Sequence, residues 1–179
     1  MPHSVLDLFI MSLLDRGLET PYDLLRQGGL SLGSSVPALR RLEETGLIRK
    51  KAPVGSSKRP RHWYQLSAAG RKLASNGWIQ LMKDPPPSDF DAVLRLADLA
   101  AYYKVKAADI ASLVERAAKD RILLSNRLSA GKDKDGVPSL LYVVTRNSWE
   151  AGRLAAEAKF LFNLAKSVST SARKKPRTV

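Results

Sequence analysis

Basic side chains grouped along one part of the sequence are the residues whose chemistry stands out: Arg40, Arg41, Lys58, Arg59 and Arg61. Guanidinium and ammonium groups attract phosphate and donate hydrogen bonds to its oxygens. Six basic residues and no acidic one lie between positions 49 and 61. Unopposed charge of this kind predicts a surface that lies against a polyanion such as nucleic acid.

The same basic residues could instead form ion pairs on the protein surface or lie in a solvated loop. Arg40 and Arg41 lie three or four residues from Glu43 and Glu44, which is the spacing of ion pairs on a helix surface. The remaining cations could belong to a solvated loop. We favour nucleic-acid contact for the loop because it directly follows a helix with a basic face, and we leave both interpretations open for the two arginines.

Segment 34–48 predicts a short helix. Hydroxyl residues and Pro37 suit its opening turns, and Gly46 can adopt the left-handed conformation that ends a helix. Leu39 and Leu42 are three residues apart and share one face. The two arginines lie toward the flank and the opposite side of that face, so the helix has one apolar and one basic face.

Two helices are expected before this segment. The first has Ser4 as its N-cap, an apolar stripe of period 3.6 and Gly17 as its stop. The second begins at Thr20, whose following proline suits a first helical position. The third begins either at Ser31, which places its proline in the second turn, or at Ser34, which places it in the first.

A basic hairpin is expected directly after the third helix. Its strands cover 47–52 and 62–66, and the connecting residues 53–61 contain glycine and serine. The order helix, helix, helix, hairpin is that of the winged helix-turn-helix, whose third helix enters the major groove of DNA.

The second half is predicted to be all helical. A fourth helix starts at Ser67, with Leu73, Ile79 and Met82 on its inner side, and ends before three consecutive prolines. Beyond them, helices are expected over 89–103, 107–128 and 139–165. The apolar stripe of the second of these is predicted to consist of Ile110, Leu113, Val114, Ala117, Leu124 and Leu128. Their apolar stripes exceed what one small bundle can hide, which favours a subunit interface.

The chain is therefore predicted to be mainly α, with an N-terminal winged helix-turn-helix and a C-terminal all-helical dimerisation region. The expected division is a DNA-binding domain 1–83, a proline-rich linker 84–88, a helical domain 89–165 and a basic, disordered tail 166–179. Charge follows this division: 13 basic and 6 acidic residues precede position 84, 12 and 11 occupy 84–165, and 5 and none occupy the tail. The formal net charge of +13 is thus concentrated at the two ends of the sequence.

Composition argues against several classes of protein. No cysteine is present, so thiolate metal sites, cysteine nucleophiles and disulfides are excluded. His3 and His62 lack partners that would suggest a metal site or a general base, and no phosphate-binding glycine loop appears. We expect no enzyme, no cofactor and no metal. The apolar run 5–14 lacks the features of a signal peptide and nothing spans a membrane, so we expect a soluble protein in the cytoplasm, associated with the nucleoid.

The sequence resembles the PadR family of bacterial transcriptional regulators. The resemblance covers about residues 5–72 and rests on LDLFIMSLLDRG at 6–17, TPYDLL at 20–25, PALRRLEETGLI at 37–48 and KRPRHWYQLSAAGR at 58–71. Family members carry a glycine where this chain has Pro21 and usually a DNA-contacting tyrosine where it has Val36. The family starts its third helix early, which favours Ser31 as the cap.

The resemblance implies a homodimer that binds double-stranded DNA and, in some members, responds to phenolic or other aromatic compounds. The residues expected at the DNA are Tyr22, Ser34, Ser35, Pro37, Arg40, Arg41, Lys58, Arg59 and Arg61. In the last helix, Tyr142 and Trp149 lie near small residues, so they are expected in the dimer core or, alternatively, in a pocket for a planar effector.

Three functions follow from these observations. The first is a homodimeric regulator, a repressor, that binds an inverted-repeat operator and is relieved by an aromatic small molecule. The second is a sequence-indifferent architectural protein of the nucleoid, which the high charge and basic tail would suit. The third is a protein-interaction module whose helical half does the binding.

Overall fold

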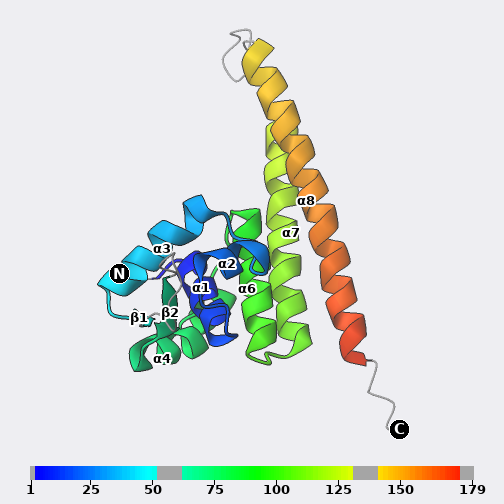
Figure 1. Ribbon diagram of the computed structural model, residues 1–179. Coiled ribbons are helices and arrows are strands. Elements are labelled where there is room, and N and C mark those ends of the chain that lie inside the picture. The colour runs from blue at the N-terminus through cyan, green and yellow to red at the C-terminus, as the bar shows by residue number, and fades with distance from the viewer. Residues whose placement is uncertain (1–2, 52–61, 131–140, 174–179) are drawn as a thin grey trace. The chain divides into compact units, whose positions relative to one another are not determined.

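The structure is a computed structural model and describes residues 3–51, 62–130 and 141–173, with side chains through residue 170. It confirms the predicted fold class, because the chain is mainly helical and a two-stranded antiparallel hairpin follows three helices (Figure 1). The chain is divided into two compact units, Met1–Asp84 and Pro85–Val179.

Short local signals set the starts of the helices in the first unit. The side chains of Ser4, Thr20 and Ser31 each accept a hydrogen bond from a backbone amide three residues later. The open choice for the third helix is thereby resolved in favour of Ser31. The elements of this unit are α1 (Val5–Asp15), α2 (Pro21–Arg26), α3 (Leu32–Glu44), β1 (Ile48–Lys51), β2 (Trp63–Leu66), α4 (Ala68–Asn76) and α5 (Ile79–Lys83).

Helix α1 is the centre of the first core. Leu8, Ile10 and Met11 are fully buried although they point to different sides of the helix, because α1 contacts α3, α4 and β2. Apolar burial on several sides is typical of a central helix. This helix is therefore the support against which α3 is held.

The hairpin is shorter than predicted, with β1 and β2 pairing from Ile48 opposite Leu66 to Lys51 opposite Trp63. Ile48, Tyr64 and Leu66 are buried, which fixes the register by placing the apolar side of the hairpin on the core. On the outer side of β2, the Tyr64 amide donates to the carbonyl of Glu19, 2.8 Å away. The hairpin is thus joined to the segment between α1 and α2.

The single fourth helix expected from Ser67 onward is wrong. It is divided into α4 and α5, and Ile79, predicted on the inner side, is exposed. At the break, a Cβ on Gly77 would lie 2.7 Å from Leu73 Cδ1 and 2.9 Å from Leu8 Cδ2. Close packing on α1 and burial of Trp78 turn the chain here, and neither is visible in local periodicity.

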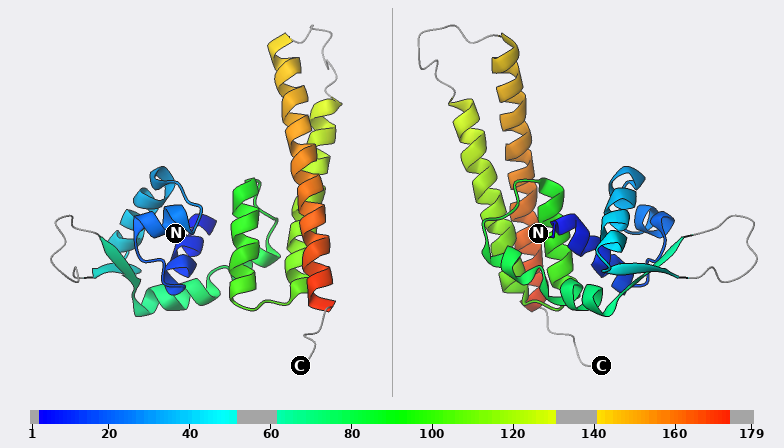
Figure 2. Two further views of the ribbon diagram at one scale, coloured as in Figure 1. Left: turned by 45° about the vertical axis from the view of Figure 1, so that its right-hand side comes forward. Right: turned by 90° about the vertical axis from the view of Figure 1, so that its left-hand side faces the viewer.

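The second unit contains α6 (Phe90–Tyr102), α7 (Ala107–Ser129) and α8 (Leu141–Arg173). Figure 2 shows α7 and α8 side by side and antiparallel. The buried residues of α8 recur at alternating spacings of three and four, with small and large side chains alternating: Ala151, Leu154, Ala158, Leu161 and Ala165. This spacing gives one seam along the helix, as in a coiled coil.

One part of the predicted α7 stripe is wrong. Leu124 is exposed, whereas Arg121 and Ser125 are buried. Polar groups tolerate burial when their hydrogen bonds are made. Ser125 Oγ donates to the carbonyl of Ala151 at 2.8 Å, and Arg121 has three partners.

Helix α8 also extends further than expected. A disordered tail was predicted from residue 166, but α8 continues to Arg173. Ser167 Oγ and Thr170 Oγ1 donate to carbonyls one turn earlier, those of Asn163 and Lys166, both 2.9 Å away. Hydroxyl side chains bonded in this way remain compatible with a helix. Residues 174–179 lie outside the described part.

Candidate nucleic-acid interface

Helix α3 is anchored on one face and open on the other. Ala38, Leu39 and Leu42 are fully buried against the core. After the helix, Gly46 has φ of 70°, a conformation that glycine adopts without strain, so the chain turns directly into β1. The apolar anchor and the abrupt end together fix how α3 presents its other face.

The open face begins with uncharged residues. Leu32 and Val36 lie four residues apart, so they neighbour each other on the helix, and they are 48% and 49% exposed. Gly33 and Pro37 are exposed beside them. The first charged side chain along this face is Arg40, which is exposed in the third turn.

The two serines predicted at the interface differ in accessibility. Ser34 is partly exposed, and its Oγ donates to the Ser31 carbonyl at 3.0 Å. Ser35 is fully buried, and its Oγ has no hydrogen-bond partner among the described residues. The structure therefore places Ser34 on the accessible part of α3 and Ser35 in the core, where no ligand reaches it without rearrangement.

Arg40 and Arg41 have different partners. Arg40 Nε donates to Glu44 Oε1 at 2.9 Å, and with the Arg40 side chain 81% exposed this pair is weak. Arg41 Nη2 instead donates to Asp7 Oδ1 of α1 at 2.8 Å, with side-chain exposures of 53% and 11%. Helix-surface pairing thus describes Arg40, whereas Arg41 links α3 to α1 and still exposes half of its side chain.

A third arginine lies on α2. Tyr22 is exposed, and the guanidinium carbon of Arg26 lies 5.7 Å from the centre of its ring. This distance permits a cation–π interaction, which holds the cation at the surface. The pair provides an aromatic hydroxyl and a positive charge on the helix before α3.

The described cations of the hairpin are not equivalent. Lys50 pairs with Glu43 at 2.8 Å, and this hydrogen bond raises the pKa of the Lys50 ammonium. Lys51 pairs with Glu19. Arg49 is exposed and makes no ion pair with any residue that the structure describes. The predicted contacts Lys58, Arg59 and Arg61 lie outside the described residues.

Sequence reasoning missed Leu32 and Arg26 as members of this surface, and it counted Arg49 only as one cation of the basic segment 49–61. Spacing gave no signal for Leu32 and Val36, because Leu32, Val36 and Leu39 follow the i, i+4, i+7 pattern of a single apolar face. Only the packing of the folded unit shows that the first two remain exposed. Nothing local distinguished Arg49 from its two lysine neighbours, since their acidic partners come from other elements.

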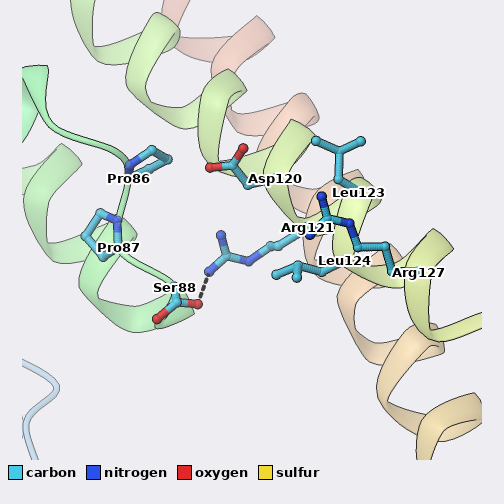
Figure 3. Close-up of a pocket in the computed structure, with 8 residues that line it drawn as sticks. All are labelled: Pro86, Pro87, Ser88, Asp120, Arg121, Leu123, Leu124 and Arg127. Carbon is cyan, nitrogen blue, oxygen red and sulfur yellow. Dashed lines mark hydrogen bonds between the residues drawn. The ribbon is translucent and has the colours of Figure 1, made fainter.

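Described residues of the second unit line two open hollows. One, of about 300 Å³, is lined by residues of the segment before α6 and of α7: Pro86, Pro87, Ser88, Asp120, Arg121, Leu123, Leu124 and Arg127 (Figure 3). The other, of about 460 Å³, shares Ser88, Leu124 and Arg127 with it and reaches α8. Neither is lined by Tyr142 or Trp149, which are 71% and 66% exposed on α8.

Arg121 borders the first hollow, but each nitrogen of its guanidinium donates to the protein itself. Only 2% exposed, it donates to Glu157 Oε2 at 2.9 Å, to the Ser88 carbonyl at 2.9 Å and to the Ala117 carbonyl at 3.1 Å. Figure 3 shows it pointing toward Ser88. It therefore joins α7, α8 and the segment before α6, and the hydrogen bonds made by all three of its nitrogens give it a structural role.

Among the described residues, no group of three or more histidine or acidic side chains could hold a metal ion. No helix in the described ranges is both long and apolar enough to cross a membrane.

No protein-family model and no curated protein matches this sequence. Among solved structures, the chain is similar to that in the crystal structure of Bacillus subtilis PadR in complex with operator DNA. The similarity has a TM-score of 0.40 and 16% sequence identity, and covers 90% of this chain and 99% of that chain.

Proposed function

We propose that this protein is a DNA-binding transcriptional regulator of the PadR type, a homodimeric repressor that binds an inverted-repeat operator. The observation that carries the proposal is the open face of α3. A helix anchored by Leu39 and Leu42, ending at Gly46 and followed by a hairpin with an exposed cation, matches the arrangement by which a winged helix-turn-helix enters the major groove.

Charge supports nucleic acid as the ligand. Arg26, Arg40 and Arg49 are exposed in three consecutive elements of the first unit, on α2, α3 and β1. The part of the sequence that precedes position 84 carries 13 basic and 6 acidic residues. Phosphate contacts of this kind supply affinity and steer association, whereas the face of a recognition helix supplies specificity.

The uncovered side of α8 supports the homodimer. Tyr142, Trp149, Gly152 and Ala156 recur at spacings that keep them on one side of the helix, and all four are exposed. Large aromatic side chains beside small residues suit the close approach of another helix. In this proposal a second copy covers this strip, and an aromatic effector would act by competing for it.

Selection from a random pool of duplexes, followed by footprinting, tests the proposal. We expect one discrete protected inverted repeat, with half-sites about one helical turn apart. Uniform protection would favour an architectural protein, and absence of DNA binding at physiological salt would favour an interaction module.

A second measurement tests the hairpin. Changing Lys58, Arg59 and Arg61 to alanine should weaken binding to all duplexes and reduce the slope of log K against log salt by about 0.9 for each phosphate that the variant no longer neutralises. A control of equal charge change is alanine at Lys104, Lys106 and Lys119 of the second unit, all exposed. If both variants have the same slope, the hairpin does not bind phosphate.

A further inference from the structure

We propose that α3 selects its DNA site through thymine methyl groups, which Leu32 and Val36 contact in the major groove. The inference rests on the proposed function and specifies what the recognition helix reads. Its starting point is that these two half-exposed side chains lie together on the first two turns of the open face. In docked helix-turn-helix proteins, the N-terminal residues of the recognition helix contact the base edges.

The usual hydrogen-bonding readers are absent from this part of α3. Guanine is read by Arg or Lys and adenine by Asn or Gln, each with two hydrogen bonds. The sequence of α3, LGSSVPALRRLEE, contains no Lys, Asn or Gln, and its first arginine lies in the third turn. Ser34 Oγ donates to the Ser31 carbonyl and Ser35 is buried. Direct readout by the first two turns is therefore apolar.

Thymine is the base that matches an apolar reader. Its C5-methyl group projects into the major groove, where cytosine carries only hydrogen, and apolar side chains distinguish the two by contact. Gly33 is exposed on the same turn, and apart from its chain neighbours and the helix backbone the nearest atom to a Cβ built on it is Ser31 Oγ at 3.9 Å. Because Gly33 has no side chain, nothing projects from this position to hold the helix away from the bases.

The surrounding charge identifies DNA rather than a protein as the occupant of this apolar surface. Exposed arginines lie on α2, on the third turn of α3 and on β1: Arg26, Arg40 and Arg49. A cationic border complements two phosphate strands on either side of a groove.

The experiment compares thymine with uracil, which lacks only the methyl group and keeps the base pair and every other major-groove group. The site recovered from the random pool is synthesised with uracil at each thymine position in turn, and its affinity for the full chain is measured. We expect about a four-fold loss for each contacted methyl, the value of one buried methyl-sized group. Uracil outside the protected site should have no effect.

A double-mutant cycle assigns the methyl groups to side chains. In Val36→Ala or Leu32→Ala, the uracil penalty at the position that side chain contacts should fall below about two-fold, because the partner of the methyl group has gone. Leu25→Ala on α2 is the matched control, since Leu25 is also an exposed leucine but lies off α3. It should leave every uracil penalty unchanged.

The outcomes separate the inference from the proposed function. If selection returns no preferred site, the regulator itself is refuted. A preferred site that binds equally well with uracil overturns only the methyl inference, as does a penalty that persists undiminished in both α3 variants. If both variants bind the site as tightly as the unmodified chain, the two side chains face a protein partner and the inference is also overturned.

Discussion

Helices α3 and α8 both leave one face uncovered and are both held from behind by an arginine–carboxylate pair, but the pairs differ in burial. Arg41 of α3 is half exposed where it reaches Asp7, whereas Arg121, which holds α8 through Glu157, is 2% exposed. Water screens the first pair, whereas the second is shielded from water and Glu157 also pairs with Arg153. The first pair leaves half of the Arg41 side chain exposed to solvent, and the second joins α7 to α8 in the interior of its unit.

The uncovered faces of α3 and α8 also differ in the kinds of side chain that they expose. On α3 the exposed apolar groups are small or aliphatic and exposed cations follow them, which suits a ligand bordered by phosphate. On α8 they are Tyr142 and Trp149 beside Gly152 and Ala156, which suits another helix. The comparison predicts that substitutions in α8 alter stability and dimerisation more than substitutions of the arginines of α3 alter stability.

The largest effect is expected from Arg121→Ala. It leaves the Ser88 and Ala117 carbonyls without this donor and a cavity in place of a fully buried side chain, while Glu157 keeps its pair with Arg153. The free energy of unfolding of the second unit should therefore fall by about 3–5 kcal/mol. Chemical denaturation followed by circular dichroism measures it. Arg127→Ala, which alters an exposed arginine of the same helix, should change the stability by less than about 0.5 kcal/mol. Equal losses of stability in the two variants would show that burial of Arg121 does not increase its contribution to stability.

A smaller effect is expected from Trp149→Glu, which places a charge in the strip that a second copy is proposed to cover. The dissociation constant of the dimer should rise by about 100-fold, since an unpaired charge in an interface costs several kcal/mol. Sedimentation equilibrium measures this constant. The control is Ile122→Glu, which places the same charge at an exposed apolar residue of α7 instead of α8. An unchanged dissociation constant for Trp149→Glu would show that the dimer interface does not include this strip.

The smallest effect is expected from the adjacent arginines of α3. Arg41→Ala should lower the free energy of unfolding of the first unit by about 1–2 kcal/mol, because Asp7 loses a charged hydrogen bond. Arg40→Ala breaks only an exposed helix pair and should cost about 0.3–0.5 kcal/mol. Thermal unfolding compares them directly. If Arg40→Ala were the more destabilising, the contact with α1 would contribute nothing.

Local chemistry allowed the first unit to be predicted in detail. Ser4, Thr20 and Gly46 act within a few residues of their own positions, so the sequence marks where the helices begin and end. The break between α4 and α5 was missed because its cause is Leu8, which is distant in sequence.

The candidate site was less predictable for the same reason. The partner of Arg41 is 34 residues away, and that of Arg121 is 36 residues away. A buried arginine in an apolar stripe cannot be recognised before its acceptors are placed, so periodicity assigned the inner position to Leu124 instead of Arg121. Ser34 and Ser35 are adjacent and chemically identical, so the sequence could not show which of them is accessible. Only the packing of the folded unit shows that Ser34 is partly exposed and Ser35 is buried.

The hydrogen bond from the Tyr64 amide to the Glu19 carbonyl has a consequence for solubility. A two-stranded hairpin has an outer edge on each strand, and unpaired amides along such an edge can recruit strands from other molecules. The carbonyl of Glu19 accepts a hydrogen bond from the outward-facing amide of Tyr64 in the middle of β2, and the Glu19 carboxylate pairs with Lys51 of β1. The short turn before α2 therefore protects one edge of the hairpin against intermolecular β-pairing.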